Sequence, residues 1–269
     1  VGFVHGVMNT DNMSILGLTI DYGPYGWLEG VDMMWTPNTT DAQGRRYCYG
    51  RQPQIGYWNL TRLAAALAPL IDDRDAIDAA LEGYEQTFSD GWTAMLANKL
   101  GLPMPAAGDD ADADMRSRLF LLLQEEECDF TIFFRQLAAV PLAAATAGDA
   151  AALAPLHAAF YSGDGPSAEH GRALLGWLQQ WAARIAAGGE PDAARIARMN
   201  ATNPKYVVRN WLAQRAIDDA TAGDTGMIER LLKMMRRPYD EQPEFDDLAG
   251  RRPEWARHKP GCSALSCSS

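Results

Sequence analysis

The sequence has few residues of the kinds that hold a structural metal ion. Only four cysteines and four histidines occur among its 269 residues. No two of the cysteines form a Cys-x-x-Cys pair, and the histidines are scattered along the chain. Structural zinc sites need such residues at close, regular spacing. The sequence therefore argues against a zinc domain, and it favours a core position for Cys128, which begins the apolar run 128–134.

Basic runs and long apolar runs are also missing. Lys and Arg number 24 against 35 Asp and Glu, which gives a formal net charge of −11. An acidic chain without a basic cluster gives no electrostatic basis for binding nucleic acid. No apolar stretch approaches the roughly 20 residues that span a bilayer, and no secretory signal opens the chain. We therefore expect no nucleic-acid partner, no membrane partner and a cytoplasmic location, with a targeting segment ahead of Val1 left open.

What the sequence does contain is a group of polar side chains in residues 5–24. Residues 14–16 and 18–20 are expected to pair as a β-hairpin about Gly17, with Asp11 and Asn12 before it and Asp21 after it. Mg²⁺ prefers oxygen ligands, usually one or two from the protein plus phosphate oxygens and water. Asn12 and Asp21 can supply such ligands, which leaves Asp11 to orient or deprotonate an attacking hydroxyl. Turn formation and capping explain the same residue types, so spacing alone leaves both interpretations open.

Three segments of the chain carry a family resemblance. Residues 5–12 read His-Gly-Val-Met-Asn-Thr-Asp-Asn and residues 20–24 Ile-Asp-Tyr-Gly-Pro; residues 199–210 read Met-Asn-Ala-Thr-Asn-Pro-Lys-Tyr-Val-Val-Arg-Asn; the chain ends in Ser-Cys-Ser-Ser. The first segment resembles the signature of the selenoprotein O family, and the second resembles its Asn-Pro-x-Tyr-x-x-Arg-Asn motif. The third resembles its C-terminus, where the third residue from the end is selenocysteine or cysteine. The segments occur in the order expected for the C-terminal portion of that family.

The resemblance implies a protein-kinase-like fold that binds ATP in an inverted orientation. Members of the family transfer AMP, rather than a γ-phosphoryl group, to Ser, Thr or Tyr hydroxyls of client proteins. By position, Asp11 matches the family's proton acceptor, Asn12 and Asp21 match its Mg²⁺ ligands, and Asp21 also lies at the ATP. Three alternatives stay open: uridylyl transfer with Mn²⁺, γ-phosphoryl transfer to a small molecule, and a redox-sensitive scaffold whose nucleotide site is vestigial. The presence of all three polar residues argues against the scaffold.

The loops that cover nucleotide phosphates are not found in the sequence. It has no Gly-x-Gly-x-x-Gly or Gly-Lys-Ser/Thr motif, and it opens on Val1 rather than on methionine. The family resembled here places those parts upstream, so we expect the chain to be the C-terminal half of a longer protein. We divide it into the catalytic loop, metal-binding hairpin and following loop (1–60), a helical C-lobe with its extension (61–236) and a C-terminal tail with Cys267 (237–269).

Beyond the expected hairpin, apolar residues recur at helical spacing. This pattern predicts a mainly α fold with a small β-hairpin, read as a kinase-like C-lobe plus a C-terminal helical extension. An apolar stripe from Ile77 to Met95 is expected in the core. Residues 141–163 are expected to be an Ala/Gly-rich connection, and the segment from Arg237 a surface tail. The expected helices cover residues 57–67, 72–100, 115–124, 130–140, 169–187, 191–199, 205–222 and 224–236.

Some residues of these motifs have more than one possible role. In the 199–210 motif, Tyr206 and Arg209 are expected to fix a helix start in preference to touching substrate. His5 resembles the histidine of a kinase catalytic loop and is expected to support that loop rather than to act as a base. The family resembled here is thought to pair its terminal cysteine or selenocysteine with a second cysteine. For Cys267 that partner is Cys48, Cys262 or none.

Overall fold

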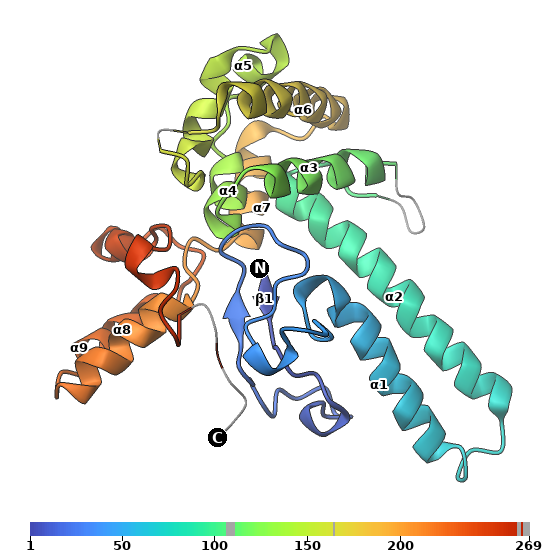
Figure 1. The fold of residues 1–269 in the computed structure, drawn as a ribbon. Helices are drawn as coiled ribbons and strands as arrows, with labels where there is room; N and C mark the ends of the chain where they lie inside the picture. The colour runs from blue at the N-terminus through green and yellow to red at the C-terminus, as the bar shows by residue number, and fades with distance from the viewer. Residues whose placement is uncertain (106–110, 164, 263–264, 266–269) are drawn as a thin grey trace.

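The computed structural model describes residues 1–105, 111–163, 165–262 and 265 of the chain. Helices dominate it, and one short antiparallel pair of strands, β1 (Phe3–Val4) and β2 (Gly26–Trp27), lies between two groups of helices (Figure 1). The prediction of a mainly α fold with a small β element is confirmed. The α-helices are α1 Gln52–Leu67, α2 Arg74–Leu100, α3 Ala113–Glu125, α4 Phe130–Leu137, α5 Leu142–Ala147, α6 Ala168–Gly188, α7 Asp192–Thr202, α8 Asn210–Thr221 and α9 Gly226–Met235. Short 3₁₀ helices are η1 Thr10–Asn12, η2 Thr39–Asp41, η3 Tyr49–Arg51, η4 Ala150–Ala159, η5 Pro243–Leu248 and η6 Glu254–Ala256.

The long helices begin and end where the sequence supplies caps. The side chain of Asp73 accepts a hydrogen bond from the Ala76 N–H at the start of α2, and Gly101 ends that helix with φ of +67°. Ser167 caps α6 in the same way through the His170 N–H. Capping side chains satisfy N–H groups that have no partner inside the helix, and glycine adopts the left-handed conformation at little cost. These signals are why the ends of α2 and α6 match the sequence prediction within two residues.

The main core lies among α3, α4, α6 and η4. Three phenylalanines of α4 are buried, and Trp177 and Trp181 of α6 stack with their ring centroids 6.1 Å apart. Both indole N–H groups donate to main-chain oxygens, of Met115 and Leu100 respectively, so their burial leaves no unpaired donor. Cys128 is fully buried here, which confirms its prediction as a core thiol.

The C-terminal segment builds a second core, which corrects the expectation of a surface tail from Arg237. Phe245, Leu248, Ala256 and Cys262 are buried against α8 and α9. The physical reason is that α8 and α9 each present one apolar face, and the following segment covers those faces. Charge and proline along residues 237–262 lie between the buried positions and hide them from a composition-based prediction.

Residues 14–20 do not form the predicted hairpin. The Gly17 N–H donates to the Ser14 oxygen at 3.1 Å and closes a turn, but these residues form no strand pair, and Ile15 and Leu16 are 78% and 76% exposed. A two-stranded hairpin is marginal in water unless its apolar face packs on another surface. The sheet instead pairs β1 with β2, Phe3 opposite Trp27. Residues 5–25, which carry all the candidate site residues, therefore form the connection between the two strands.

Two further sequence predictions need correction. The helix expected over 205–222 begins at Asn210, because the N–H groups of Lys205 and Tyr206 both donate to the Pro238 oxygen instead of entering a helix. The segment expected as an Ala/Gly-rich connection contains α5 and the 3₁₀ helix η4, which carries Pro155. Only Ala145, Ala152 and Ala159 of its alanines are buried, together with Leu153 and Leu156, so packing on α6 and α4 rather than periodicity fixes this part of the chain.

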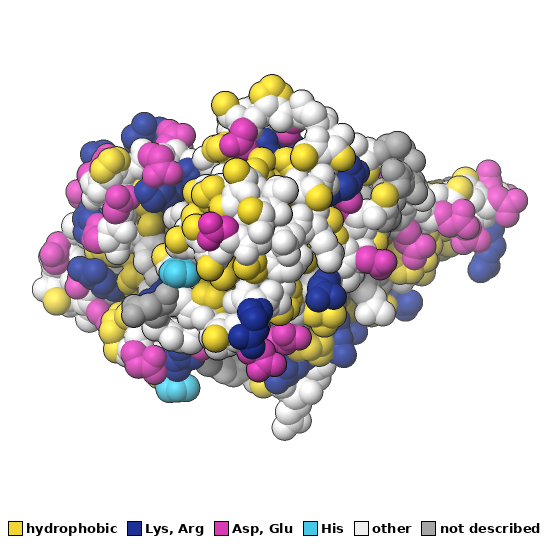
Figure 2. All heavy atoms as spheres, turned by 90° about the horizontal axis from the view of Figure 1, so that it is seen from above, with side chains coloured by type: hydrophobic (Ala, Val, Ile, Leu, Met, Phe, Trp, Pro, Cys, Tyr) yellow, Lys and Arg dark blue, Asp and Glu magenta, His cyan; other side chains and the backbone are white. Residues whose placement is uncertain are grey.

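The helices α1 and α2 form a hairpin that projects from one side of the molecule (Figure 1). The stripe on α2 faces α1 but is incompletely covered, since Phe88 and Met95 are 37% and 36% exposed. The other four residues of the stripe, Ile77, Leu81, Tyr84 and Trp92, are only partly buried, so the expectation that the stripe lies in the core is wrong. Acidic side chains gather on the projecting end, as Figure 2 shows, among them Asp72, Asp73, Asp75, Asp78 and Glu82. Among the described helices, none combines the length and the apolar character needed to cross a bilayer.

Candidate functional site

The loop that follows β1 is held in place from two sides. Gln52, the first residue of α1, donates to the Phe3 oxygen at 2.9 Å and accepts from the His5 N–H at 3.1 Å. Further along α1, Asn59 donates to the Met8 oxygen at 2.9 Å. Asn38, which is buried, donates to the Gly6 oxygen at 3.2 Å. Amide side chains thus fix the backbone of the loop that carries the candidate catalytic residues.

His5 supports this loop, as predicted. Its Nε2 lies 3.0 Å from the main-chain oxygen of Asp21, and its Nδ1 lies 3.3 Å from the Val7 N–H. A carbonyl oxygen only accepts and an amide N–H only donates, so the ring is the neutral tautomer with its proton on Nε2. Both ring nitrogens are occupied by the backbone. His5 therefore joins the two ends of the connection between β1 and β2 and has no free nitrogen for base chemistry.

Asn12 and Asp21 line the same cavity, which is the arrangement expected of a shared metal site. The amide nitrogen of Asn12 donates to the Val7 oxygen at 3.0 Å, and its Oδ1 makes no hydrogen bond within the described residues. The carboxylate of Asp21 is 43% exposed, and its Oδ2 lies 3.9 Å from Nε2 of the neutral His5 ring. Both side chains therefore offer free oxygen atoms to the cavity.

Asp11 lies in η1, directly before Asn12, with an exposed side chain. Within the described part of the chain, its carboxylate accepts no hydrogen bond and it is not among the residues that line the cavity. The structure thus brings Asn12 and Asp21 together and places Asp11 beside them, facing solvent. An exposed, unpaired carboxylate next to the cavity is accessible to a hydroxyl group of another molecule.

The cavity has a volume of about 560 Å³, in the range of small-molecule sites. One wall is the connection between β1 and β2, and the opposite wall is one face of α8. Residue Leu265 completes the rim, because its backbone pairs with Pro37 and Thr39 through N–H···O bonds of 2.8 Å each. The lining residues are Val7, Asn12, Asp21, Gly23, Pro24, Tyr25, Asn210, Ala213, Gln214, Ile217, Gly261 and Leu265.

The donor set suits magnesium better than zinc. No group of three or more His, Cys, Asp or Glu side chains that could hold a metal ion occurs among the described residues. Two protein oxygens, one amide and one carboxylate, are the usual contribution to a Mg²⁺ ion that completes its shell with phosphate and water. Asn12 and Asp21 carry one amide oxygen and one carboxylate, so they could supply that contribution.

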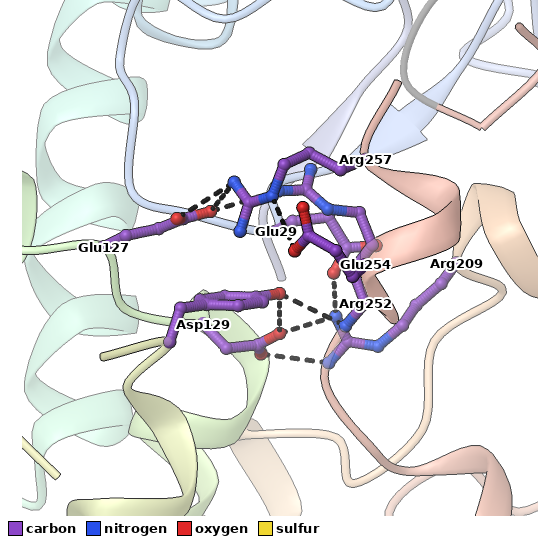
Figure 3. A network of polar contacts seen from close by, with 8 residues as sticks. Glu29, Glu127, Asp129, Arg209, Arg252, Glu254 and Arg257 are labelled. Carbon is purple, nitrogen blue, oxygen red and sulfur yellow. Dashed lines mark hydrogen bonds and ion pairs between the residues drawn. The ribbon is translucent and has the colours of Figure 1, made fainter. Parts of the chain in front are cut away.

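The motif residue Arg209 lies away from the cavity in a buried ion network (Figure 3). It donates to both carboxylate oxygens of Asp129, at 2.8 and 2.9 Å, and also to Glu29. Burial alone would lower the pKa of Arg209, but the charges of Asp129 and Glu29 outweigh it and raise the pKa above its ordinary value. Burial raises the pKa of Glu29, and the positive charge of Arg209 lowers it by a smaller amount. This geometry supports the prediction that Arg209 fixes a helix start, since α8 begins at the next residue.

A second part of this network surrounds Glu127. The guanidinium of Arg257 donates to both of its carboxylate oxygens, and Arg252 donates to one of them at 3.1 Å (Figure 3). The side chains of Glu29, Glu127 and Asp129 were not identified from the sequence. Their arginine partners lie at least 80 residues away, so the only local signal was the position of Asp129 before the apolar run that became α4.

The described cysteines give no disulfide. Cys48, Cys128 and Cys262 are free and buried, and burial raises the pKa values of the Cys128 and Cys262 thiols. Cys267 lies outside the described residues, so its pairing with Cys48, with Cys262 or with neither stays a prediction.

The comparisons with known proteins agree with the resemblance read from the motifs. The family model described as "Protein adenylyltransferase SelO" matches residues 1–236. Relatives named "Protein nucleotidyltransferase YdiU" are 54% identical in Nitrosospira multiformis over 288 residues, 52% in Rhodopirellula baltica and 51% in Tolumonas auensis. Each alignment covers 100% of this chain and 50 or 51% of the relative, so the chain spans about half the length of the curated relatives it matches. On this evidence the chain belongs to the SelO family, described as protein adenylyltransferase.

Proposed function

We propose that this chain supplies the hydroxyl-orienting and metal-binding part of a protein adenylyltransferase. The observation that carries the proposal is that Asn12 and Asp21, both in the connection between β1 and β2, line one cavity and carry side-chain oxygens that make no hydrogen bond within the described residues. Family membership supports a nucleotidyltransferase class for the protein. The kinase-like character of the fold is part of the proposal.

In the proposed reaction a Ser, Thr or Tyr hydroxyl of a client protein attacks the α-phosphorus of ATP. The new bond is between the hydroxyl oxygen and phosphorus, the bond from phosphorus to the bridging oxygen of pyrophosphate breaks, and pyrophosphate leaves. Asp11 orients the hydroxyl and accepts its proton. Its exposed position next to the cavity supports this role. Mg²⁺, when bound, would neutralise charge on the phosphates, with Asn12 and Asp21 as its protein ligands; Mn²⁺ is the alternative ion.

The test uses this chain extended to the full length of the family. ATP labelled on the α-phosphorus and ATP labelled on the γ-phosphorus are compared in the presence of Mg²⁺, with a protein substrate mixture as acceptor. We expect label in protein from the α position alone. Label from the γ position alone would move the protein to the phosphotransferases, and better transfer from UTP with Mn²⁺ would favour uridylyl transfer. Nucleotide binding without transfer to any acceptor would favour a scaffold.

A further inference from the structure

The side chain of Asn210 contains a buried acceptor that is not used by the protein. Asn210 is 8% exposed, and its amide nitrogen donates to the Tyr25 oxygen at 3.2 Å. Its Oδ1 is buried and has no hydrogen-bond partner among the described residues. A buried polar atom without a partner costs about 1–3 kcal/mol, and Asn210 lines both the 560 Å³ cavity and a second cavity beside Glu29, so this acceptor is a candidate for contact with a ligand.

The orientation of this amide is fixed by its neighbours. The Tyr25 oxygen can only accept, so the nitrogen must face it and Oδ1 must be the unpaired atom. Gly26 leaves room for the amide: a Cβ atom there would lie 3.1 Å from the Asn210 nitrogen and 3.2 Å from its oxygen. Exchanging the two amide atoms would lose the Tyr25 bond and leave a donor unpaired instead. Oδ1, rather than the amide nitrogen, is therefore the unpaired atom of the Asn210 side chain.

Asn210 belongs to the face of α8 that lines the 560 Å³ cavity. That face continues with Ala213, Gln214 and Ile217, at the spacing of one side of a helix. Asn12 and Asp21 lie on the opposite wall. Phosphates held at that wall would leave the remainder of a nucleotide, its nucleoside, against α8. Ala213 and Ile217 offer apolar contacts to it, and Asn210 offers one acceptor.

We propose that Asn210 is a specificity-determining residue whose Oδ1 accepts a hydrogen bond from the nucleoside of the bound nucleotide. The donor is a ribose hydroxyl or the exocyclic amine of the base, which share this chemistry. The inference rests on the proposed function, because it takes the cavity beside Asn12 and Asp21 as the nucleotide site. It goes beyond that function by assigning the nucleoside to α8.

The test is a thermodynamic cycle in which the Asn210 acceptor and a hydrogen-bond donor of the nucleotide are removed separately and together. Dissociation constants with Mg²⁺ are measured for ATP, 2′-deoxy-ATP, 3′-deoxy-ATP and purine riboside triphosphate, which lacks the amine, on the chain extended to the family's full length. For the original protein we expect one of the three analogues to bind about 10-fold more weakly than ATP. The analogue that does so identifies the donor. In Asn210→Ala the same analogue should bind as well as ATP does.

Two further variants separate recognition from loss of structure. Asn210→Asp retains an acceptor oxygen and should retain the discrimination, although its charge weakens binding of every nucleotide. Arg215→Ala, on the same helix but outside the cavity lining, should leave all four constants unchanged. The role of Asn210 is refuted, and the proposed function stands, in either of two cases. The original protein binds all four nucleotides equally, or Asn210→Ala discriminates between ATP and the analogues as strongly as the original protein does. If ATP does not bind at all, the nucleotide site and the inference both fail.

Discussion

Replacing Arg209 with methionine should destabilise the protein strongly, because it removes the only cation that contacts Asp129 among the described residues. Asp129 is fully buried, the Glu29 side chain is 11% exposed, and both accept hydrogen bonds from Arg209. Removing one partner of a buried ion pair costs about 3–5 kcal/mol, since the remaining charge is left without compensation. Against a typical free energy of unfolding of about 5–15 kcal/mol, such a loss is large.

The assay is denaturant unfolding followed by tryptophan fluorescence, with Asp129→Asn and the double variant alongside. Asparagine at 129 can still accept the hydrogen bond that the Ile132 N–H gives to this side chain at the start of α4. Because the two residues share one interaction, the double variant should lose at least about 2 kcal/mol less than the sum of the single losses. Additive losses, or a loss below about 1 kcal/mol for Arg209→Met, would refute the stabilising role of this network.

The same variant should show a distinct pH dependence. Burial already raises the pKa of Glu29, and removing Arg209 removes a charge that lowers it. A carboxyl group whose folded pKa is above its unfolded value binds protons more tightly in the folded state, so its stability contribution is lost as pH rises through the folded pKa. The penalty of Arg209→Met should therefore be smaller at pH 5 than at pH 8. An equal penalty at both pH values would contradict this electrostatic explanation.

Three other substitutions test separate parts of the structure. Asp21→Ala should abolish transfer of α-label. Because the Asp21 carboxylate is 43% exposed, the free energy of unfolding should change by no more than about 0.5 kcal/mol. An active, folded variant would overturn the assignment of Asp21 as a metal and nucleotide ligand. Asn59→Ala should slow transfer about 10- to 100-fold, because the substitution removes the hydrogen bond that holds the Met8 backbone. The dissociation constant of ATP should change little, because Asn59 does not line the cavity. Steady-state kinetics separate the effect on the transfer rate from the effect on ATP binding. Burial lowers the pKa of Lys99 from 10.5 to about 7, so the unfolded state binds one more proton than the folded state between pH 7 and pH 9. The free energy of unfolding should therefore rise by about 2–3 kcal/mol from pH 7 to pH 9. Denaturation at both pH values measures this gain, which should be absent in Lys99→Met.

The helices could be predicted well from the sequence because their signals are local. Apolar spacing located α2 and α6, and caps such as Asp73 and Ser167 set their starts. The pairing of β1 with β2 could not be predicted in the same way. Both strands are two residues long, and the apolar residues 14–20 gave the stronger strand signal. Strand pairing depends on a surface to pack on, which a local pattern does not describe.

The candidate site was predictable in part for a related reason. Asn12 and Asp21 belong to one short segment, and the motif resemblance gave their expected roles, but the hairpin over residues 14–20 that was expected to bring them together does not form. The cavity wall formed by α8 lies nearly 200 residues further along the chain, and Asn210 was visible only as the last letter of a motif. The partners of Arg209 were also distant, because Glu29 and Asp129 are separated from it by 180 and 80 residues.

Structural support and ligand contact are not competing explanations of the motif that ends in Arg209 and Asn210. Arg209 anchors the start of α8 to Asp129 in the main core and to Glu29 next to β2. The following residue is thereby fixed beside Tyr25 with its Oδ1 free. A flexible helix start could not hold a single acceptor in position for a nucleoside, whereas a buried bidentate ion pair restricts it to one geometry. If Asn210 contacts the nucleoside as proposed, Arg209 supplies the structural support for that contact. A conservative Arg209→Lys change, which cannot reproduce the bidentate contact, should then weaken the nucleotide discrimination of Asn210 before it unfolds the protein.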